Sequence, residues 1–246
     1  MKKTFTSDRV KVLDDVMHYL PCSTSVARVR GWQEIKVFNG FQVEMRAWET
    51  INVFDIFLLI ASVKYFQDHT EDIEQGQITK DRETVTVKMK LWEFAERYLH
   101  THNYHAIEES LKRLSSFQAF YKQSNGDIKE QRYLLFFEVA TVEAVQYLTV
   151  GLSKSFYDYC LKGLTLNFAL LQSITTPTAR LLYMYVAGQR NTAFYQPTLE
   201  RALGLNGKDY DNRKRITTAF NELQKSGSIA QSWKKKTPKG WLFGYR

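Results

Sequence analysis

The chain has 246 residues, more than one average domain, and its hydrophobic fraction of 44% is enough to bury two modest cores. A charged fraction of 24% is unlike that of disordered or fibrous proteins. Two cysteines, Cys22 and Cys160, exclude a disulfide framework and indicate a reducing cytosol. The first residues lack the apolar core of a secretion signal, and the most apolar stretch, 51–66, is too short and too polar to cross a bilayer. We therefore expect a cytoplasmic protein that does not bind membranes.

The positive charge is concentrated at one end of the chain. Residues 178–246 contain 13 Lys and Arg against 4 Asp and Glu, a net charge of +9, whereas residues 1–177 contain 21 and 22, a net charge of −1. The basic region keeps an ordinary globular composition with interspersed aromatic residues. It therefore predicts a folded nucleic-acid-binding face rather than a disordered basic tail.

Apolar periodicity and turn residues predict the elements of the first half of the chain. They are a helix over 9–19, a strand or hairpin over 34–45, a helix over 47–67, a loop over 68–82, a strand over 84–89, helices over 91–98 and 104–115, and a hairpin formed by 117–122 and 131–139 around Asn125-Gly126. Helix, strand, helix, turn, helix and hairpin is the order of a winged helix.

A similar order recurs in the second half. The predicted elements are a strand over 148–151, a helix over 154–161, a strand over 164–166, helices over 168–173, 178–188, 197–203 and 210–225, and strands over 228–236 and 241–246. The fold class that follows is α+β and mainly helical, with tandem winged-helix domains. We expect an N-terminal extension over 1–28, a first domain over 29–142 and a second domain over 143–246.

The last long helix has two different faces. Its apolar residues recur with helical spacing and are expected to pack inward. The opposite face and its flanks carry the side chains Arg213, Lys214, Arg215, Thr217, Thr218, Asn221 and Lys225. Such side chains supply the hydrogen-bond donors and methyl contacts that read base edges in the major groove.

The following hairpin is also basic. Its lysines, Lys234, Lys235, Lys236 and Lys239, are placed to reach phosphates beside a recognition helix. Trp233 and Trp241 are expected to anchor this hairpin to the core.

With these pieces the chain resembles the theta-type plasmid replication initiators, which have two winged-helix domains and bind iterons. The matching segments, within a resemblance that covers about 29–246, are Thr178 to Tyr183, Leu199 to Gly204, Tyr210 to Ile216 and Ala219 to Leu223. The resemblance implies that the second domain binds repeated origin DNA while the first contacts the backbone and dimerises. It also implies a dimer in equilibrium with the monomer, repression of its own gene by the dimer, and recruitment of the host replication initiator and replicative helicase.

The first domain departs from a DNA-reading pattern. Its corresponding helix carries Glu108 and Glu109 beside Lys112 and Arg113, a mixed face that repels phosphate as much as it attracts it. Dimerisation or another protein contact is the role expected of this domain.

Two other functions compete with replication initiation. A transcriptional regulator with two winged helices would share every feature above. A rolling-circle nickase would use His100 and His102 with Tyr157 or Tyr159 as the attacking hydroxyl. Because Thr101 between the histidines is placed at a helix end, we expect no enzyme, no cofactor and no metal, and we interpret the cluster, with His105, as a polar turn.

Overall fold

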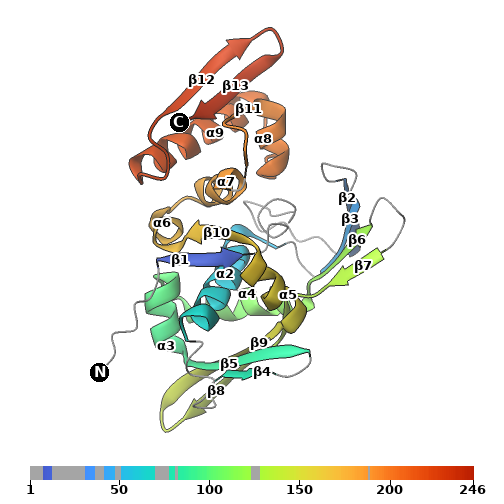
Figure 1. Ribbon diagram of the computed structural model, residues 1–246, viewed down its shortest axis with the longest axis vertical. Coiled ribbons are helices and arrows are strands. Elements are labelled where there is room, and N and C mark those ends of the chain that lie inside the picture. Colours follow the sequence, from blue (N-terminus) through green and yellow to red (C-terminus); the bar gives the residue numbers. More distant parts are fainter. Residues whose placement is uncertain are drawn as a thin grey trace.

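The computed structural model of the chain describes residues 8–12, 31–36, 42–47, 51–69, 78–80, 83–122, 128–187 and 189–246. Helices and strands are mixed along these residues, which confirms the α+β class (Figure 1). Among them no helix combines the length and the apolarity that crossing a bilayer requires.

The first motif consists of one helix, two strands, a short helical segment that continues into a π-helical turn, a longer helix and a hairpin. Its sheet has the order β4-β5-β9-β8, and all neighbours are antiparallel. The elements are α2 (Val53–Asp68), β4 (Ile78–Lys80), β5 (Thr84–Lys90), α3 (Leu91–Phe94), the π-helical turn η3 (Ala95–Leu99), α4 (Tyr104–Ser116), β8 (Leu134–Val142) and β9 (Val145–Ser153).

The second motif repeats this order without the equivalent of β4. Its sheet has the order β11-β13-β12, so the last strand again lies in the middle, as β9 does between β5 and β8. The elements are α7 (Pro177–Ala187), β11 (Ala193–Tyr195), α8 (Gln196–Ala202), α9 (Asp209–Lys225), β12 (Ser232–Thr237) and β13 (Gly240–Tyr245).

The two hairpins also share a residue pattern. In the first, Phe136 of β8 lies opposite Gly151 of β9, and in the second, Trp233 of β12 lies opposite Gly244 of β13. A Cβ atom on either glycine would lie within 2.3 Å of the facing aromatic ring. Each ring therefore covers the backbone of a glycine on the central strand of its sheet.

The remaining elements extend the first motif. Strand β1 (Arg9–Val12) pairs with β10 (Leu164–Asn167), and α5 (Lys154–Lys162) and α6 (Phe168–Ser173) flank β10 in the sequence. A separate antiparallel sheet, drawn at the right of Figure 1, has the order β2-β3-β6-β7. Its strands are β2 (Gly31–Lys36), β3 (Gln42–Ala47), β6 (Gln118–Lys122) and β7 (Ile128–Gln131).

The prediction of a helix over 9–19 is wrong for residues 9–12, which form strand β1. Val10 is buried while Arg9 and Lys11 are exposed, and this alternation is the period of a strand. Residues 13–19 lie outside the described part of the chain.

The hairpin of the first motif is not the expected one. Strand β6 pairs with β7, in the separate sheet, while β8 pairs with β9, so residues 134–142 join a different partner from 117–122. Asn125-Gly126 lies outside the described residues.

The domain boundary expected between 142 and 143 coincides with the tight turn of the β8–β9 hairpin, where Glu143 and Ala144 have positive φ. Because β9 also pairs with β5, residues 145–153 belong to the sheet of the first motif.

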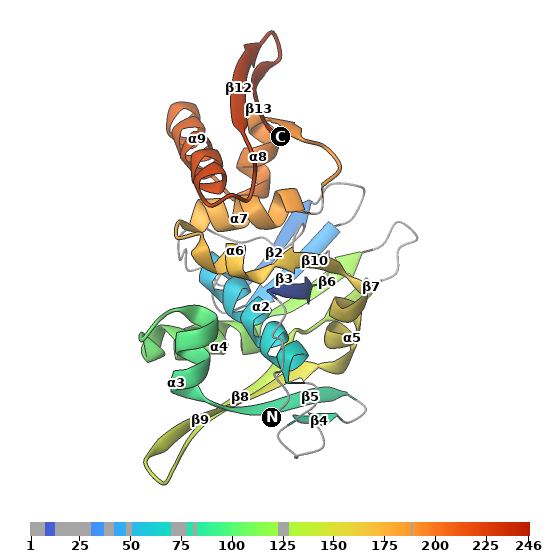
Figure 2. The same ribbon diagram turned by 60° about the vertical axis from the view of Figure 1, so that its left-hand side comes forward.

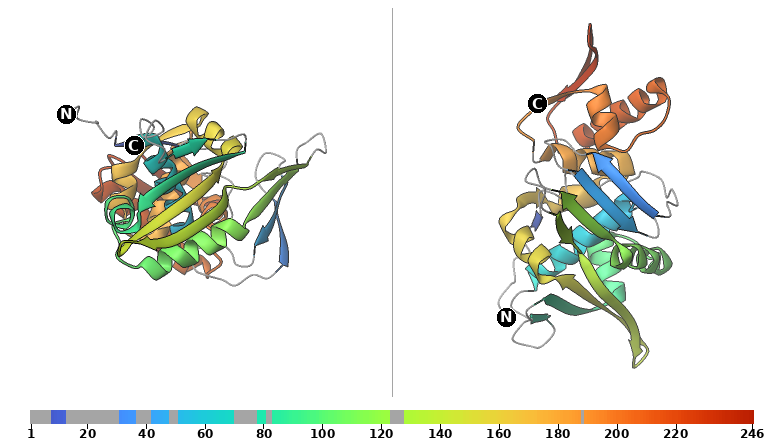
Figure 3. Two further views of the ribbon diagram at one scale, coloured as in Figure 1. Left: turned by 90° about the horizontal axis from the view of Figure 1, so that it is seen from below. Right: turned by 90° about the vertical axis from the view of Figure 1, so that its right-hand side faces the viewer.

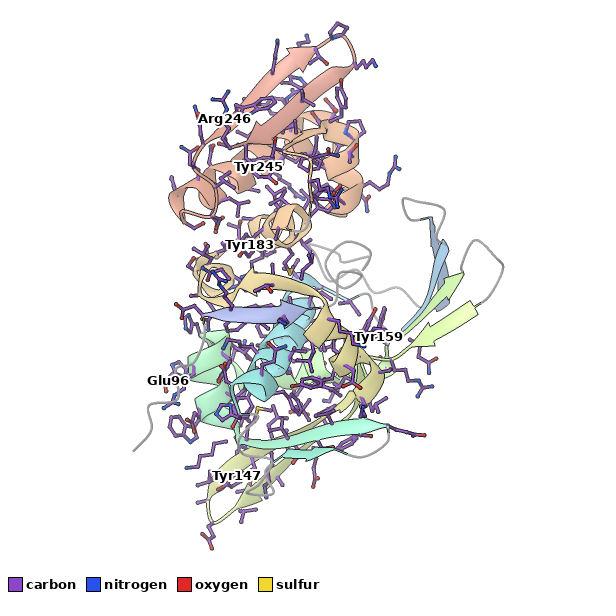
Figure 4. The ribbon with its side chains drawn as sticks, viewed as in Figure 1. Glu96, Tyr147, Tyr159, Tyr183, Tyr245 and Arg246 are labelled. Carbon is purple, nitrogen blue, oxygen red and sulfur yellow. The ribbon has the colours of Figure 1, made fainter. Side chains whose placement is uncertain are left out.

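Helix α2 is buried on nearly every side, which fits its continuous apolar sequence. It contacts α4, β1 and α7, so the first helices of the two motifs pack directly against each other (Figures 2 and 3). The Arg180 guanidinium of α7 lies 4.2 Å from the centre of the Phe57 ring of α2. Close by, the Tyr183 hydroxyl is 3.2 Å from both the backbone N and O of Asn167 (Figure 4).

Candidate nucleic-acid interface

Helix α9 is seated by four apolar residues that the sequence predicts to face inward. Ile216, Ala219, Phe220 and Leu223 are all buried. The Phe220 ring stacks on Phe243 of β13, with ring centres 6.1 Å apart. Acidic residues in the first turn and Lys225 in the last turn match the helix dipole. The central strand of the sheet thus fixes the position of the helix.

A fifth buried residue, Asn212, fixes the turn before α9. Its amide accepts a hydrogen bond from the Gly207 backbone N at 3.2 Å and donates to the Gly207 carbonyl at 3.0 Å and to Glu200 Oε1 at 3.2 Å. This side chain therefore joins α8, the intervening turn and the start of α9. The sequence pattern does not predict this role, because a single Asn in a basic helix gives no periodic signal.

The outward face of α9 carries most of the predicted contact residues. At 100° per residue, Lys214, Thr218, Asn221 and Lys225 fall on the side opposite the buried residues, and all four are exposed. Arg215 is exposed on one flank of this face. Donors of three chemical kinds, ammonium, hydroxyl and amide, thus lie along one helical surface.

The hairpin formed by β12 and β13, here called the basic hairpin, lies beside this surface (Figure 1). Lys234 and Lys236 pair with Phe243 and Trp241, so they share the sheet face that packs toward α9. The Lys234 ammonium donates to the Thr217 hydroxyl at 3.5 Å. Lys235 is on the opposite face, Lys239 is in the turn, and all four lysines are exposed.

Two predicted contact residues, Arg213 and Thr217, lie between α9 and the basic hairpin. The half-buried Arg213 guanidinium is 5.0 Å from the Trp241 ring centre and 5.5 Å from that of Tyr210, and it pairs with Asp209 at 3.4 Å. The Thr217 hydroxyl donates to the Arg213 carbonyl at 2.8 Å. These two residues brace the helix against the hairpin. Trp241 packs against the core, as predicted for an anchoring residue.

Tyr210 is a surface residue that the sequence analysis missed. It is 67% exposed in the first turn of α9, and it precedes Lys214 by four residues, so the two lie on the same side of the helix. An aromatic ring four residues before a lysine on the outward face is the signal that would have identified it.

Glu222 is an acidic residue of α9 that turns away from the outward face. Its carboxylate accepts hydrogen bonds from the backbone N and hydroxyl of Thr175 and of Thr176, at 2.5–3.0 Å. Partial burial alone would raise the pKa of Glu222, but these hydrogen bonds lower it below the usual value. The carboxylate thus fastens α9 to the segment that precedes α7.

The equivalent helix of the first motif, α4, presents different chemistry. Lys112 pairs with both Glu108 and Glu109 at 2.9 Å. Arg113 forms two hydrogen bonds of 2.9 Å to the buried carboxylate of Asp55 on α2. Its cations are therefore engaged by acids of the same motif, and the face that corresponds to the outward face of α9 is mixed in charge.

The residues considered for catalysis or metal binding lie apart from this surface. His100, with φ of 51°, ends η3, and the Asn103 side chain accepts from the Ala106 backbone N at 3.0 Å to begin α4. Tyr157 is buried, which raises the pKa of its hydroxyl to about 12, whereas Tyr159 is exposed on α5 (Figure 4). Within the described residues no group of three or more His, Cys, Asp or Glu side chains is placed to hold a metal ion.

No model of a known protein family matches the chain, and no curated protein matches it significantly. The function is therefore inferred from the geometry of α9 and the basic hairpin.

Proposed function

We propose that the chain consists of two tandem winged helices. The repeated order of helix, strand, two helices and hairpin supports this, because in a winged helix the last strand also lies between the other two. The shared pairing of a glycine with a covering aromatic residue, Gly151 with Phe136 and Gly244 with Trp233, adds support from independent side chains. The motifs would then span about 53–153 and 177–245.

We further propose that the second winged helix binds double-stranded DNA in a sequence-specific way. The observation that carries this proposal is the juxtaposition of the outward face of α9 with the basic hairpin, which is held by the stack of Phe220 on Phe243 and by the contact of Arg213 with Trp241. Lys214 and Asn221 would hydrogen-bond base edges in the major groove, with Lys225 near the backbone. Each good bidentate contact of this kind contributes roughly 1–3 kcal/mol of base discrimination.

The basic hairpin would contact phosphates as the wing. Lys235 and Lys239 are exposed and engaged by no α9 side chain, so they are free to follow the DNA backbone beside the groove. Each phosphate that they neutralise adds about −0.9 to the slope of log affinity against log salt. The resulting affinity would be strongly salt dependent.

The biological role that we propose is initiation of plasmid replication at repeated origin DNA, as in the initiators that the chain resembles. The first motif suits a protein partner, because α4 has a mixed-charge face and β8 is an edge strand of its sheet. That edge exposes Phe136, Val139 and Val142. Unpaired strand edges with apolar side chains are sites of strand pairing between chains, and we propose a second copy as the partner.

The DNA-binding proposal is tested by selecting a site from random 30-base-pair duplexes and measuring the affinity by fluorescence anisotropy. We expect the Lys214→Ala/Asn221→Ala variant to bind the selected duplex at least tenfold more weakly, equivalent to about 1.4 kcal/mol. Lys112→Ala, at an exposed position on α4, is the matched control and should leave binding unchanged. Equal affinities for the double variant and the natural chain would disprove the assignment of α9.

A second measurement separates replication from transcriptional regulation. DNA that flanks the coding region should contain several direct repeats matching the selected site, and the double variant should fail to maintain a plasmid that depends on those repeats. A single palindromic site with normal maintenance would identify a regulator instead.

A further inference from the structure

A polar pocket of about 200 Å³ lies where α2, η3 and α6 meet, beside Asp8. None of its lining residues belongs to α9 or to the basic hairpin. The pocket is therefore separate from the proposed DNA surface.

The floor of the pocket is a buried ion pair. Lys64 and Asp68 pair across one turn of α2, and their side chains are only 4% and 7% exposed. The Tyr98 hydroxyl donates to Asp68 at 3.1 Å. Because both ions must be desolvated, such a pair contributes little net stability compared with apolar residues of the same size. Because both residues line the pocket, the pair would present one positive and one negative group to a ligand.

The rim of the pocket also carries one positive and one negative side chain. The exposed charged residues of the lining, Asp8 and Arg97, form this rim, and Arg97 also pairs with Glu93 at 2.8 Å. Between floor and rim, Phe168 and Tyr98 form an aromatic wall with ring centres 6.2 Å apart. The lining therefore matches a small molecule that carries both charges and an apolar part.

The walls are held in place before any ligand binds. Gln172 of α6 donates to the carbonyls of Arg97 and Tyr98 at 2.8 and 3.1 Å, which fastens α6 to η3. These two residues belong to a π-helical turn, a feature that recurs at functional sites. We infer that this pocket binds a small zwitterion of the size of a free α-amino acid, with its ammonium toward the carboxylates and its carboxylate toward Lys64 and Arg97.

The inference is tested by thermal unfolding of the full chain with each of the common amino acids at 10 mM. At a Kd of about 1 mM, we expect at least one of them to raise Tm by roughly 3–6 °C. Succinate and putrescine, which each carry only one kind of charge, should not do so. No rise with any amino acid would overturn the inference, and an equal rise with succinate or putrescine would overturn the ligand class.

Variants locate the site. In Lys64→Met/Asp68→Leu both charges are replaced by apolar groups of similar size, so the fold should be retained while the ligand-induced rise disappears. The matched control is Lys154→Met/Asp158→Leu, the same pair at the same spacing on α5 but exposed, which should respond like the natural chain. Arg97→Gln alters only the exposed rim and should weaken binding about tenfold in calorimetry, even if the buried double variant does not fold. An undiminished response in Arg97→Gln and in the buried double variant would place the ligand elsewhere.

Discussion

Single side chains determine how the basic hairpin is held against α9. Arg213 has the residue type of a DNA contact, yet Trp241, Tyr210 and Asp209 surround its guanidinium. Gly244 has a similar structural role, because the Trp233 ring occupies the space that a side chain would need. The composition of the sequence predicts a basic surface here. It does not predict which cationic side chains are exposed and which, like Arg213, hold the hairpin against the helix, because that depends on contacts between distant segments.

At Gly244, replacement by Ala should destabilise the second motif. The new Cβ would lie 2.2 Å from the Trp233 ring, so the ring must leave its position on the sheet. We expect a loss of about 1–3 kcal/mol in the free energy of unfolding, measured by urea denaturation. The companion variant is Gly227→Ala, where the new Cβ would meet no atom within 4 Å but the backbone has a φ of +77°. It therefore measures the cost of backbone strain alone, whereas Gly244→Ala measures the steric clash. Unchanged stability in Gly244→Ala would show that Trp233 does not pack as described.

Glu222 gives a pH-dependent prediction. Its pKa is lowered in the folded chain from the ordinary value of 4.5, so its hydrogen bonds stabilise the fold above that value and are lost as the pH falls through the folded pKa. The Glu222→Gln variant should therefore be less stable than the natural chain at pH 7, and the difference should shrink below pH 4.5. Equal differences at pH 7 and pH 3, measured by thermal unfolding, would contradict this role.

Elements whose pattern is local agree closely with the sequence prediction. Helices α4, α5, α6, α8 and α9 begin and end within one or two residues of the predicted bounds, because apolar spacing is encoded within each segment. Asn103 and Asn167 also cap the starts of α4 and α6. Strand pairing is not local in this way. The sequence offers several short apolar strands after α4, and only the packed fold determines that β8 pairs with β9. Strand β11, three residues long, was missed for the same reason, since its partner β13 lies far along the chain.

At the scale of the whole molecule, the positive charge is concentrated in the second motif. If the second motif binds DNA as proposed, the salt dependence of that binding reports how many phosphates the basic hairpin contacts. The Lys235→Ala/Lys239→Ala variant should weaken binding to the selected duplex. It should also reduce the slope of log affinity against log salt by about 1.8, or about 0.9 for each lost phosphate contact. Base preference in a competition assay should stay the same, because neither lysine lies on α9. A slope that does not change would show that the hairpin lies away from the backbone.

The order of the strands also has a consequence for synthesis of the chain. Helix α9 packs on Phe243, in the strand that completes the sheet between β11 and β12. On a ribosome, residues 209–225 emerge before their apolar side has this strand to cover it. A nascent chain can pack α9 against α7 but cannot complete the packing of α9 until residues 240–245 have left the exit tunnel. The sheet of the first motif can close much earlier, once β9 is available.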